Sequence, residues 1–213
     1  MAAKLALQGF QKSQTLVVDP RKPYCDSPVL LQRRVRAGGY DRSLEVNAFR
    51  PCRRCAKCLQ FRQMQWRQRA LNEIARANRT WMVTLTFAPT HLAGLYAERA
   101  VANFEGLRGL DRVAYPHVQK YLKRVRKFSK AKIRYLCVFE LGEKSGRAHY
   151  HALLHEVGEQ PVTKACLQGQ WRSHVHAKLV ANGRGSASYI TKYATKSLDI
   201  RPRASSGYGK TMI

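Results

Sequence analysis

Two strand-like segments joined by a short turn constrain the fold of this chain more than any other part of its sequence. The first is IRYLCVFEL, residues 133–141, and the second is RAHYHALLHE, residues 147–156. β-Branched and aromatic residues favour strands in both, and the intervening GEKSG has the composition of a hairpin turn. The sequence therefore predicts two antiparallel strands that are neighbours in one sheet.

Further elements extend this hairpin into a mixed fold. WMVTLTF, residues 81–87, and residues 173–180 predict two more strands. Prolines and glycines make residues 1–50 irregular, and residues 88–114 read mainly as loop. Apolar spacing typical of helices occurs in residues 57–78, 116–130, 163–171 and 186–198. We expect an α+β fold whose central antiparallel sheet has about four or five strands, with the flanking helices on one side of it.

The chain is expected to contain three regions. Residues 1–79 hold an irregular segment, a cysteine cluster and a long basic helix, and residues 80–200 hold the sheet. Residues 201–213 read as a flexible basic tail. Their ASSGYGKT segment resembles a phosphate-binding loop, but such a loop needs a helix after it, and only Met212 and Ile213 follow.

The charge of the chain indicates its class of partner. There are 39 Lys and Arg against 13 Asp and Glu, a formal net charge of +26. A polyanion normally offsets such self-repulsion, which favours nucleic acid over a ribosomal-type or membrane-surface basic protein. No segment approaches the ~18 apolar residues of a membrane span, and no signal peptide is evident. A cytoplasmic location without a membrane partner is therefore expected.

Basic residues on two predicted helices are candidates for guiding a nucleic-acid strand. Trp66 or Trp81 is expected to stack on its bases. The candidate basic contacts are Arg62, Arg67, Lys120, Lys123, Arg124, Arg126 and Lys127.

His149 and His151 are two apart in a predicted strand, so they share one face of the sheet. If the hairpin closes symmetrically, Glu140 pairs with His149 on that face, whereas a slip of one residue would turn it away. Two imidazoles, a carboxylate and water would suit Mg²⁺ or Mn²⁺ bound to a phosphate. The alternative is a pair of half-exposed histidines without a ligand.

Three other histidines are weaker candidates. His174 and His176 have the same spacing in another predicted strand, between Arg172 and Lys178. Without a neighbouring acid this environment disfavours a cation, so the first pair is preferred. His155, at the end of its strand, is expected to face solvent.

The segment YITKYATK, residues 189–196, predicts a helix with paired tyrosines. Tyr189 and Tyr193 lie one turn apart on one face, and Lys192 and Lys196 follow them at i+3. A tyrosine hydroxyl can attack phosphorus and hold a strand covalently, with a nearby lysine favouring the phenolate. Two tyrosines would allow two successive transfers. The alternative is that the tyrosines pack the helix onto the sheet while the lysines bind phosphate.

Cys52, Cys55 and Cys58 fall within a seven-residue segment. This spacing is typical of metal or redox sites in a reducing compartment rather than of a disulfide scaffold. Cys25 is the best fourth ligand. Zn²⁺ in a structural site is expected, with an iron–sulfur cluster or free thiols as alternatives.

Together these features resemble the HUH endonuclease superfamily of rolling-circle replication initiators. They resemble more closely the replication initiation proteins of microviruses, in particular the gokushovirus type. The matching stretches are PCRRCAKC (Pro51–Cys58), WMVTLTF, IRYLCVFELGEKSGRAHYHALL (Ile133–Leu154) and SYITKYATKSL (Ser188–Leu198). They run in the family's order, and little before Tyr24 matches. The resemblance implies an HUH/RRM-like core with an N-terminal cysteine-rich metal module, and a cysteine upstream of the cluster.

The resemblance also implies cleavage of single-stranded DNA at a replication origin, with a 5′-phosphotyrosine, a free 3′-OH that primes synthesis, and later rejoining. By position, His149 and His151 are the metal ligands, and Glu140 is the acidic residue before them. Tyr189 and Tyr193 match the nucleophiles, and either could cut first. A host helicase or polymerase and a bacterial cytoplasm are the implied setting if the chain is phage-encoded.

Two other functions fit parts of the sequence. A zinc-containing, non-catalytic protein that binds single-stranded nucleic acid would keep the charge and the cysteines. A single-tyrosine HUH transposase would share the histidines.

Overall fold

The computed structural model divides the chain into two compact units, Met1–Phe61 and Arg62–Ile213. The residues that it describes are 16–18, 25–36, 43–142, 146–196 and 200–210. Within these residues, no helix is long and apolar enough to cross a bilayer.

The first unit contains a small sheet where we expected an irregular segment. Strands β2 (Val29–Arg36) and β3 (Ser43–Arg50) pair antiparallel along their whole lengths. Strand β1 (Leu16–Val18) pairs parallel with β3. The prediction was wrong because the Gly38-Gly39 pair was read as a sign of irregular chain. Glycines between two strand-forming segments equally mark the connection between paired strands.

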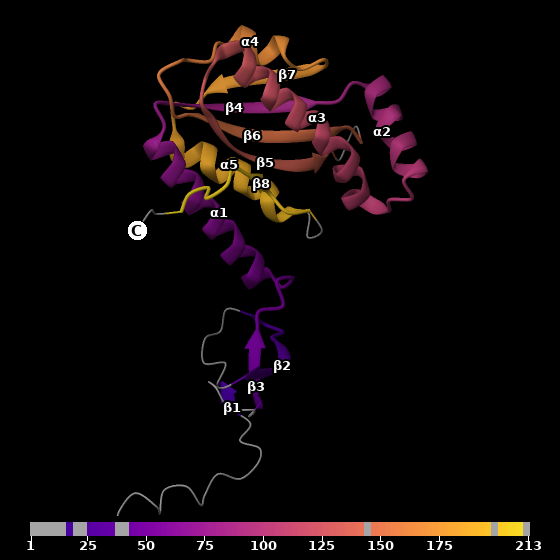
Figure 1. Ribbon diagram of the computed structural model, residues 1–213, viewed down its shortest axis with the longest axis vertical. Coiled ribbons are helices and arrows are strands. Elements are labelled where there is room, and N and C mark those ends of the chain that lie inside the picture. The colour runs from indigo at the N-terminus through magenta and orange to yellow at the C-terminus, as the bar shows by residue number, and fades with distance from the viewer. Residues whose placement is uncertain (1–15, 19–24, 37–42, 143–145, 197–199, 211–213) are drawn as a thin grey trace, which may run out of the picture. The chain divides into compact units, whose positions relative to one another are not determined.

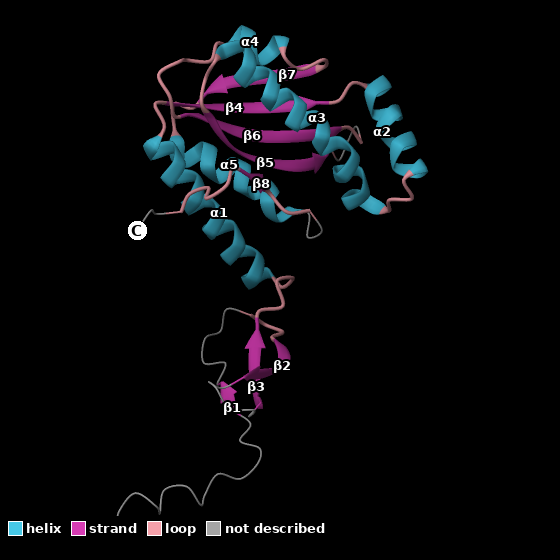
Figure 2. Cartoon of the chain, in the orientation of Figure 1, coloured by secondary structure: helices cyan, strands magenta, loops and turns pink. Residues whose placement is uncertain are grey.

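The second unit is built on a five-stranded sheet in which every neighbouring pair is antiparallel (Figure 2). The strands, in spatial order, are β7 (His174–Leu179), β4 (Arg79–Thr86), β6 (Ala148–Glu156), β5 (Ile133–Leu141) and β8 (Arg203–Ala204). The hairpin predicted from the sequence is formed by β5 and β6. The expected α+β class with an antiparallel sheet is therefore confirmed.

One face of this sheet carries the larger hydrophobic core. Trp81, Val83 and Leu85 alternate along β4 and are buried on this face. The helices that cover it are α2 (Pro89–Val101), α3 (Gly106–Ser129) and α4 (Lys164–Gly169), as Figure 1 shows. Burial of this apolar side of the sheet is the main stabilising contribution of the unit.

The opposite face is partly covered by α1 (Ala56–Arg76) and α5 (Gly183–Lys196), so helices lie on both sides of the sheet and not on one as we expected. β5 and β6 have buried residues on both of their faces, which accounts for their nearly continuous apolar sequences. The core on this side consists of Ala70, Leu136, Val138, Leu153, Ala187, Ile190 and Tyr208.

Helices occupy most of residues 88–114, which we read mainly as loop. α3 begins at Gly106, so Pro116 lies inside the helix and not in its first turn. The buried stripe of Leu110, Ala114 and Val118 continues through the proline. Burial of this stripe outweighs the usual cost of an interior proline, ~3 kcal/mol.

The segment from Arg203 to Lys210 packs against the sheet and α1, where we expected a flexible tail. β8 pairs with β5, and Tyr208 is buried. His155 is fully buried as well, contrary to its expected exposure. Its ring nitrogens lie 2.8 Å from the Tyr208 hydroxyl and 3.0 Å from the Thr80 hydroxyl. Burial lowers the pKa of His155 to about 4, so the ring is neutral.

Gly209 closes the C-terminal segment against α1. Its N–H donates to the Glu73 carboxylate at 2.7 Å, and two hydrogen bonds from Arg134 hold the same carboxylate. Gly209 has a φ of +63°, and a Cβ at this position would lie 2.4 Å from the Cα of Arg69. The glycine-rich sequence that resembles a phosphate-binding loop thus allows close packing of the chain on a helix.

We expect Gly209→Ala to destabilise the protein by about 3 kcal/mol or more. It adds a clash with the backbone of α1 to the cost of a left-handed alanine, which is about 1–2 kcal/mol alone. Gly207→Ala is the matched control, since Gly207 also has a φ of +63° but nothing within 4 Å of its Cβ position. Urea unfolding measures both variants, and equal losses of stability would contradict the packing described for Gly209.

Candidate functional site

The two histidines of β6 lie on the face of the sheet that α1 and α5 partly cover. His149 pairs with Thr86 of β4, and His151 pairs with Thr84. The Nδ1 atom of His149 is 2.8 Å from the Thr86 hydroxyl, and that of His151 is 3.2 Å from the Thr84 hydroxyl. The two rings stack with their centroids 6.4 Å apart. Their shared face, predicted from the spacing, is thus present.

Sequence reasoning missed Thr84 and Thr86. The signal was present in WMVTLTF, because alternation turns both threonines away from the face on which Val83 and Leu85 are buried. A threonine oxygen that accepts from Nδ1–H fixes the tautomer in which Nε2 carries the free lone pair. The threonines can therefore orient both histidines as ligands.

Glu140 lies opposite His149 in the β5–β6 ladder, which confirms the symmetric hairpin register. Its carboxylate reaches diagonally to the other histidine, so that Oε2 lies 2.8 Å from Nε2 of His151. Both side chains are largely buried, with 13% of Glu140 and 7% of His151 exposed. The acid and the two imidazoles therefore share one side of the sheet.

These side chains are donors of the kinds that divalent cations bind. Burial lowers the pKa of His149, and His151 acts in the same direction, so a nitrogen lone pair is available near neutral pH. Among the described residues, however, only the four cysteines bring three or more ligand atoms within 4.8 Å of one another. An ion bound by Glu140 and His151 would have to draw His149 closer.

Helix α5 brings Tyr189 to this group of side chains. The Tyr189 ring stands at 87° to that of His151, with centroids 5.8 Å apart. Tyr189 is 46% exposed, which leaves it accessible to a ligand. Lys192 is exposed on the next turn of α5. Tyr193 and Lys196 also belong to α5, but their side chains lie outside the described part of the chain.

The second histidine pair lies on the same face as the first, one strand beyond the threonines. Thr84 separates His176 from one histidine of β6, and Thr86 separates His174 from the other. His174 and His176 are both exposed. Their proximity to the first pair depends on the pairing of β7 with β4, which are far apart in the sequence.

Most of the basic residues expected to guide a strand are not next to the histidines. Helix α3 packs on the other face of the sheet, and two of its arginines, Arg124 and Arg126, donate to the backbone carbonyls of Gln170 and Ile133. The residues of this group on α3 are Lys120, Lys123, Arg124, Arg126 and Lys127, and those on α1 are Arg62 and Arg67.

Trp81 is not available to stack on a base, which corrects one of our two expectations for the tryptophans. Its side chain is buried, and its indole N–H donates to Glu156 at 2.7 Å. Trp66 is partly exposed on α1.

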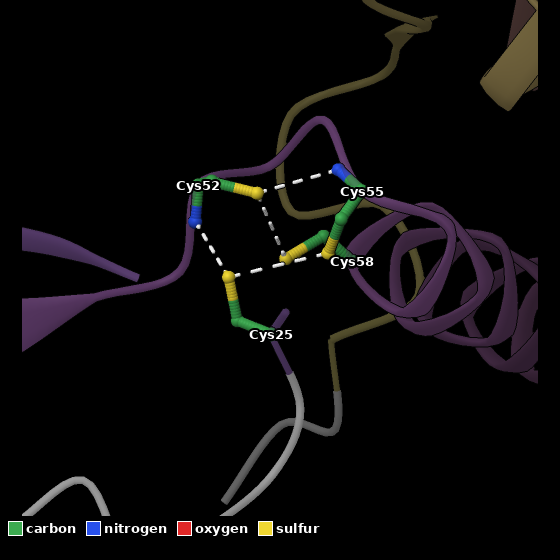
Figure 3. A group of neighbouring side chains, drawn as sticks. All are labelled: Cys25, Cys52, Cys55 and Cys58. Atoms are coloured by element: carbon green, nitrogen blue, oxygen red, sulfur yellow. Dashed lines mark hydrogen bonds between the residues drawn. The ribbon is translucent and has the colours of Figure 1, made fainter. Parts of the chain in front are cut away.

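The first unit contains the predicted group of Cys25, Cys52, Cys55 and Cys58, shown in Figure 3. The four Sγ atoms lie within 4.8 Å of one another, with 4.0 Å between Cys52 and Cys58 and between Cys25 and Cys55. A tetrahedral ion with S ligands at about 2.3 Å needs sulfurs about 3.8 Å apart. The cluster therefore has the size of a four-cysteine metal site.

Backbone N–H groups surround the sulfurs of this cluster. Cys52 receives them from Arg54 at 3.4 Å and from Cys55 at 3.3 Å, and its own N–H points to Cys25 at 3.2 Å. The two bonds to Cys52 lower its pKa to about 6. Burial instead raises the pKa of Cys58 to about 12. The N–H groups stabilise thiolates, the form in which cysteine binds metals.

Known proteins provide an independent comparison with this arrangement. One curated relative is the "Replication-associated protein ORF4" of Chlamydia phage 1, 27% identical over 145 residues, which are 64% of this chain and 32% of that protein. Another is the "Replication-associated protein VP4" of Bdellovibrio phage phiMH2K, 24% identical over 169 residues, which are 70% of this chain and 48% of that protein. The chain thus spans less than half the length of either relative.

A solved structure and a family model also match. The hypothetical protein ORF119 of Sulfolobus islandicus rod-shaped virus 1 superposes with a TM-score of 0.39 and 14% identity, over 61% of this chain and 95% of its own. The model of the ORF2-type family of replication-associated proteins matches residues 80–198, which include both histidine pairs and most of α5. Because this match covers more than half of the sequence, the chain belongs to the ORF2-type family of replication-associated proteins.

Proposed function

We propose that this chain initiates DNA replication by nicking single-stranded DNA at an origin, with a tyrosine nucleophile and a divalent metal ion. The observation that carries the proposal is the position of Tyr189, whose ring lies 5.8 Å from that of His151, itself bonded to Glu140. Family membership supports a role in replication, and the net charge of +26 supports DNA as the partner. The cytoplasm of a bacterial host, with a host helicase or polymerase, would be the setting.

The metal ligands in this proposal are His149, His151 and Glu140. Mg²⁺ or Mn²⁺ held there would polarise the oxygens of the scissile phosphate. Thr84 and Thr86 act as positioning residues, since each accepts from a histidine Nδ1–H and leaves Nε2 free.

In the cleavage step the phenol oxygen of Tyr189 attacks phosphorus. A bond forms between these two atoms while the bond from phosphorus to the 3′ oxygen breaks, and that electron pair stays on the 3′ oxygen. The phenol proton is released and the 3′ oxygen takes up a proton, which gives a 5′-phosphotyrosine and a free 3′-OH. The charge of Lys192 would favour the phenolate and offset the developing negative charge.

Tyr193 follows one turn after Tyr189 on α5 and would be the second nucleophile, with Lys196 in the role of Lys192. It would accept the strand in the second transfer that rejoins the ends. Tyr189 is assigned the first cut because of its position beside His151.

We expect Tyr189→Phe to lower the rate of the first covalent attachment at least 100-fold, because phenylalanine has no oxygen to attack phosphorus. The assay incubates the protein with Mn²⁺ and single-stranded fragments of the genome that encodes it, and then counts DNA retained on protein in denaturing gels. Tyr96→Phe, another exposed tyrosine, is the matched control and should attach DNA at the wild-type rate.

The other outcomes of this assay separate the competing functions. Attachment at Tyr193 in the wild type, mapped by mass spectrometry, would contradict the assignment of Tyr189 as first nucleophile. Full rounds of strand transfer by Tyr193→Phe would favour the single-tyrosine transposase. Binding without any covalent product would favour the non-catalytic nucleic-acid binding protein.

We expect Thr86→Val to lower nicking about 10–100-fold and to raise the Mn²⁺ concentration needed for half-maximal rate, because His149 loses the partner that orients it. Thr86→Ser should restore both quantities. Thr80→Val is the control, since it removes a similar contact on the same strand, to His155. Both variants should lose stability, but an equal Mn²⁺ requirement in the two would contradict the positioning role.

We propose that the cysteine cluster holds Zn²⁺ in a structural role. Wild-type protein should carry one zinc per chain, and Cys52→Ser should lose it, because only three thiolates remain. Cys166→Ser, a buried cysteine of α4, is the control and should keep its zinc. Elemental analysis checks this prediction. Iron with acid-labile sulfide would indicate an iron–sulfur cluster instead, and no metal would indicate free thiols.

A further inference from the structure

A pocket of about 340 Å³ opens on the sheet face opposite to the histidines. It is formed by Phe87 after the end of β4, by α2 and α3, and by Trp171 and Arg172 after α4. This volume falls in the range of about 300–1,000 Å³ that small-molecule sites occupy. The pocket belongs entirely to the second unit and shares no residue with the site described above.

Positive charge dominates the lining of this pocket. Lys120 and Arg172 are exposed there, and two hydrogen bonds to the Gln170 carbonyl, at 2.8 and 3.0 Å, fix the guanidinium of Arg124. Two histidines, His91 and His117, complete the polar part. No acidic side chain is among the described residues that line it, although the charge of Glu98 acts on His117. Such a lining favours an anionic ligand.

Aromatic rings form the apolar wall of the pocket. Phe87 and Trp171 are buried, and their rings meet edge to face with centroids 5.1 Å apart. Phe87 also contacts His117 at 5.9 Å, and Trp171 contacts Tyr121 at 5.6 Å. These mutual contacts hold the wall in a fixed shape. A ligand that suits both parts of the pocket has a flat, partly apolar group next to a negative one.

We propose that this pocket binds a phosphorylated nucleoside, with its phosphate beside Lys120, Arg124 and Arg172 and its base against the Phe87–Trp171 wall. Phosphate is well matched to lysine and arginine donors, and a base offers the flat face. The nucleotide could be one unit of a DNA strand or a free mononucleotide. The first source rests on the proposed function, and the second does not.

The pocket is connected to the histidine site through a single residue. The indole N–H of Trp171 donates to the carbonyl of Thr86 at 3.1 Å, and the hydroxyl of Thr86 contacts His149 on the other face. A nucleotide against Trp171 would therefore lie directly behind the strand end that positions a proposed metal ligand. This proximity favours a unit of the DNA strand as the source.

Calorimetric titration of the whole chain tests the proposal with dAMP, dTMP, inorganic phosphate and a short single-stranded oligonucleotide. We expect both mononucleotides to bind at least tenfold more tightly than phosphate. Lys120→Ala and Arg172→Ala should each weaken nucleotide binding about tenfold, as expected for a lost charged hydrogen bond. Lys164→Ala, an exposed lysine of α4 outside the pocket, is the matched control and should change it less than twofold.

Lys120→Arg keeps the charge and should retain binding, which separates loss of the contact from loss of the fold. Tighter binding of the oligonucleotide than of the mononucleotides, with the same sensitivity to Lys120→Ala, assigns the pocket to a DNA strand, and equal binding assigns it to free nucleotides. Tyr189→Phe should bind nucleotide as the wild type does, so failure of nicking is distinguishable from failure of the pocket.

Three results would overturn the proposal. One is the absence of binding by any nucleotide. Another is an equal effect of Lys164→Ala and Lys120→Ala, which would indicate attraction spread over the whole basic surface. The third is inorganic phosphate binding as tightly as the mononucleotides, since the aromatic wall would then have no part in recognition.

Discussion

The antiparallel pairing of β6 with β4 and β5 is the constraint on which the rest of the structure depends. Because side chains alternate, every second residue of β6 faces the large core, and the residues between them face the other side. Tyr150 is therefore buried while its neighbours, His149 and His151, meet the threonines and Glu140. A slip of one residue would bury the imidazoles in an apolar layer. The hydrophobic core thus fixes the register that assembles the polar site.

The same alternation makes the two faces of the sheet suitable for different tasks. The core face gives β4 and β6 a rigid support through α2, α3 and α4. The other face is only partly covered, which leaves room for α5 to present Tyr189 beside an exposed stretch of sheet. The C-terminal segment stabilises the covered half, where Tyr208 bonds to His155 and Gly209 bonds to Glu73. A site on rigid strands, with a nucleophile from a separate helix, suits chemistry that requires precise placement.

Local sequence patterns predicted the elements of the site better than their surroundings. The hairpin register that places Glu140 opposite His149 followed from the turn length, and the tyrosine helix followed from its spacing. What depends on pairing between distant segments could not be read. The position of His174 and His176 beside the first pair requires the β4–β7 ladder, and the burial of His155 requires Tyr208, which lies 53 residues later in the chain. The expected loops over residues 88–114 failed because burial of an apolar stripe overrode the proline signal.

The central claim is that His149, His151 and Glu140 hold a metal ion within reach of Tyr189. A crystal structure of the chain grown with Mn²⁺, with the ion identified by its anomalous scattering, tests this claim most directly. We predict manganese within about 2.0–2.3 Å of an Nε2 atom from each histidine and of a Glu140 oxygen, with the Tyr189 hydroxyl facing the open coordination position. Manganese bound by other residues, or a Tyr189 hydroxyl turned away from the ion with no strand able to reach both, would contradict it.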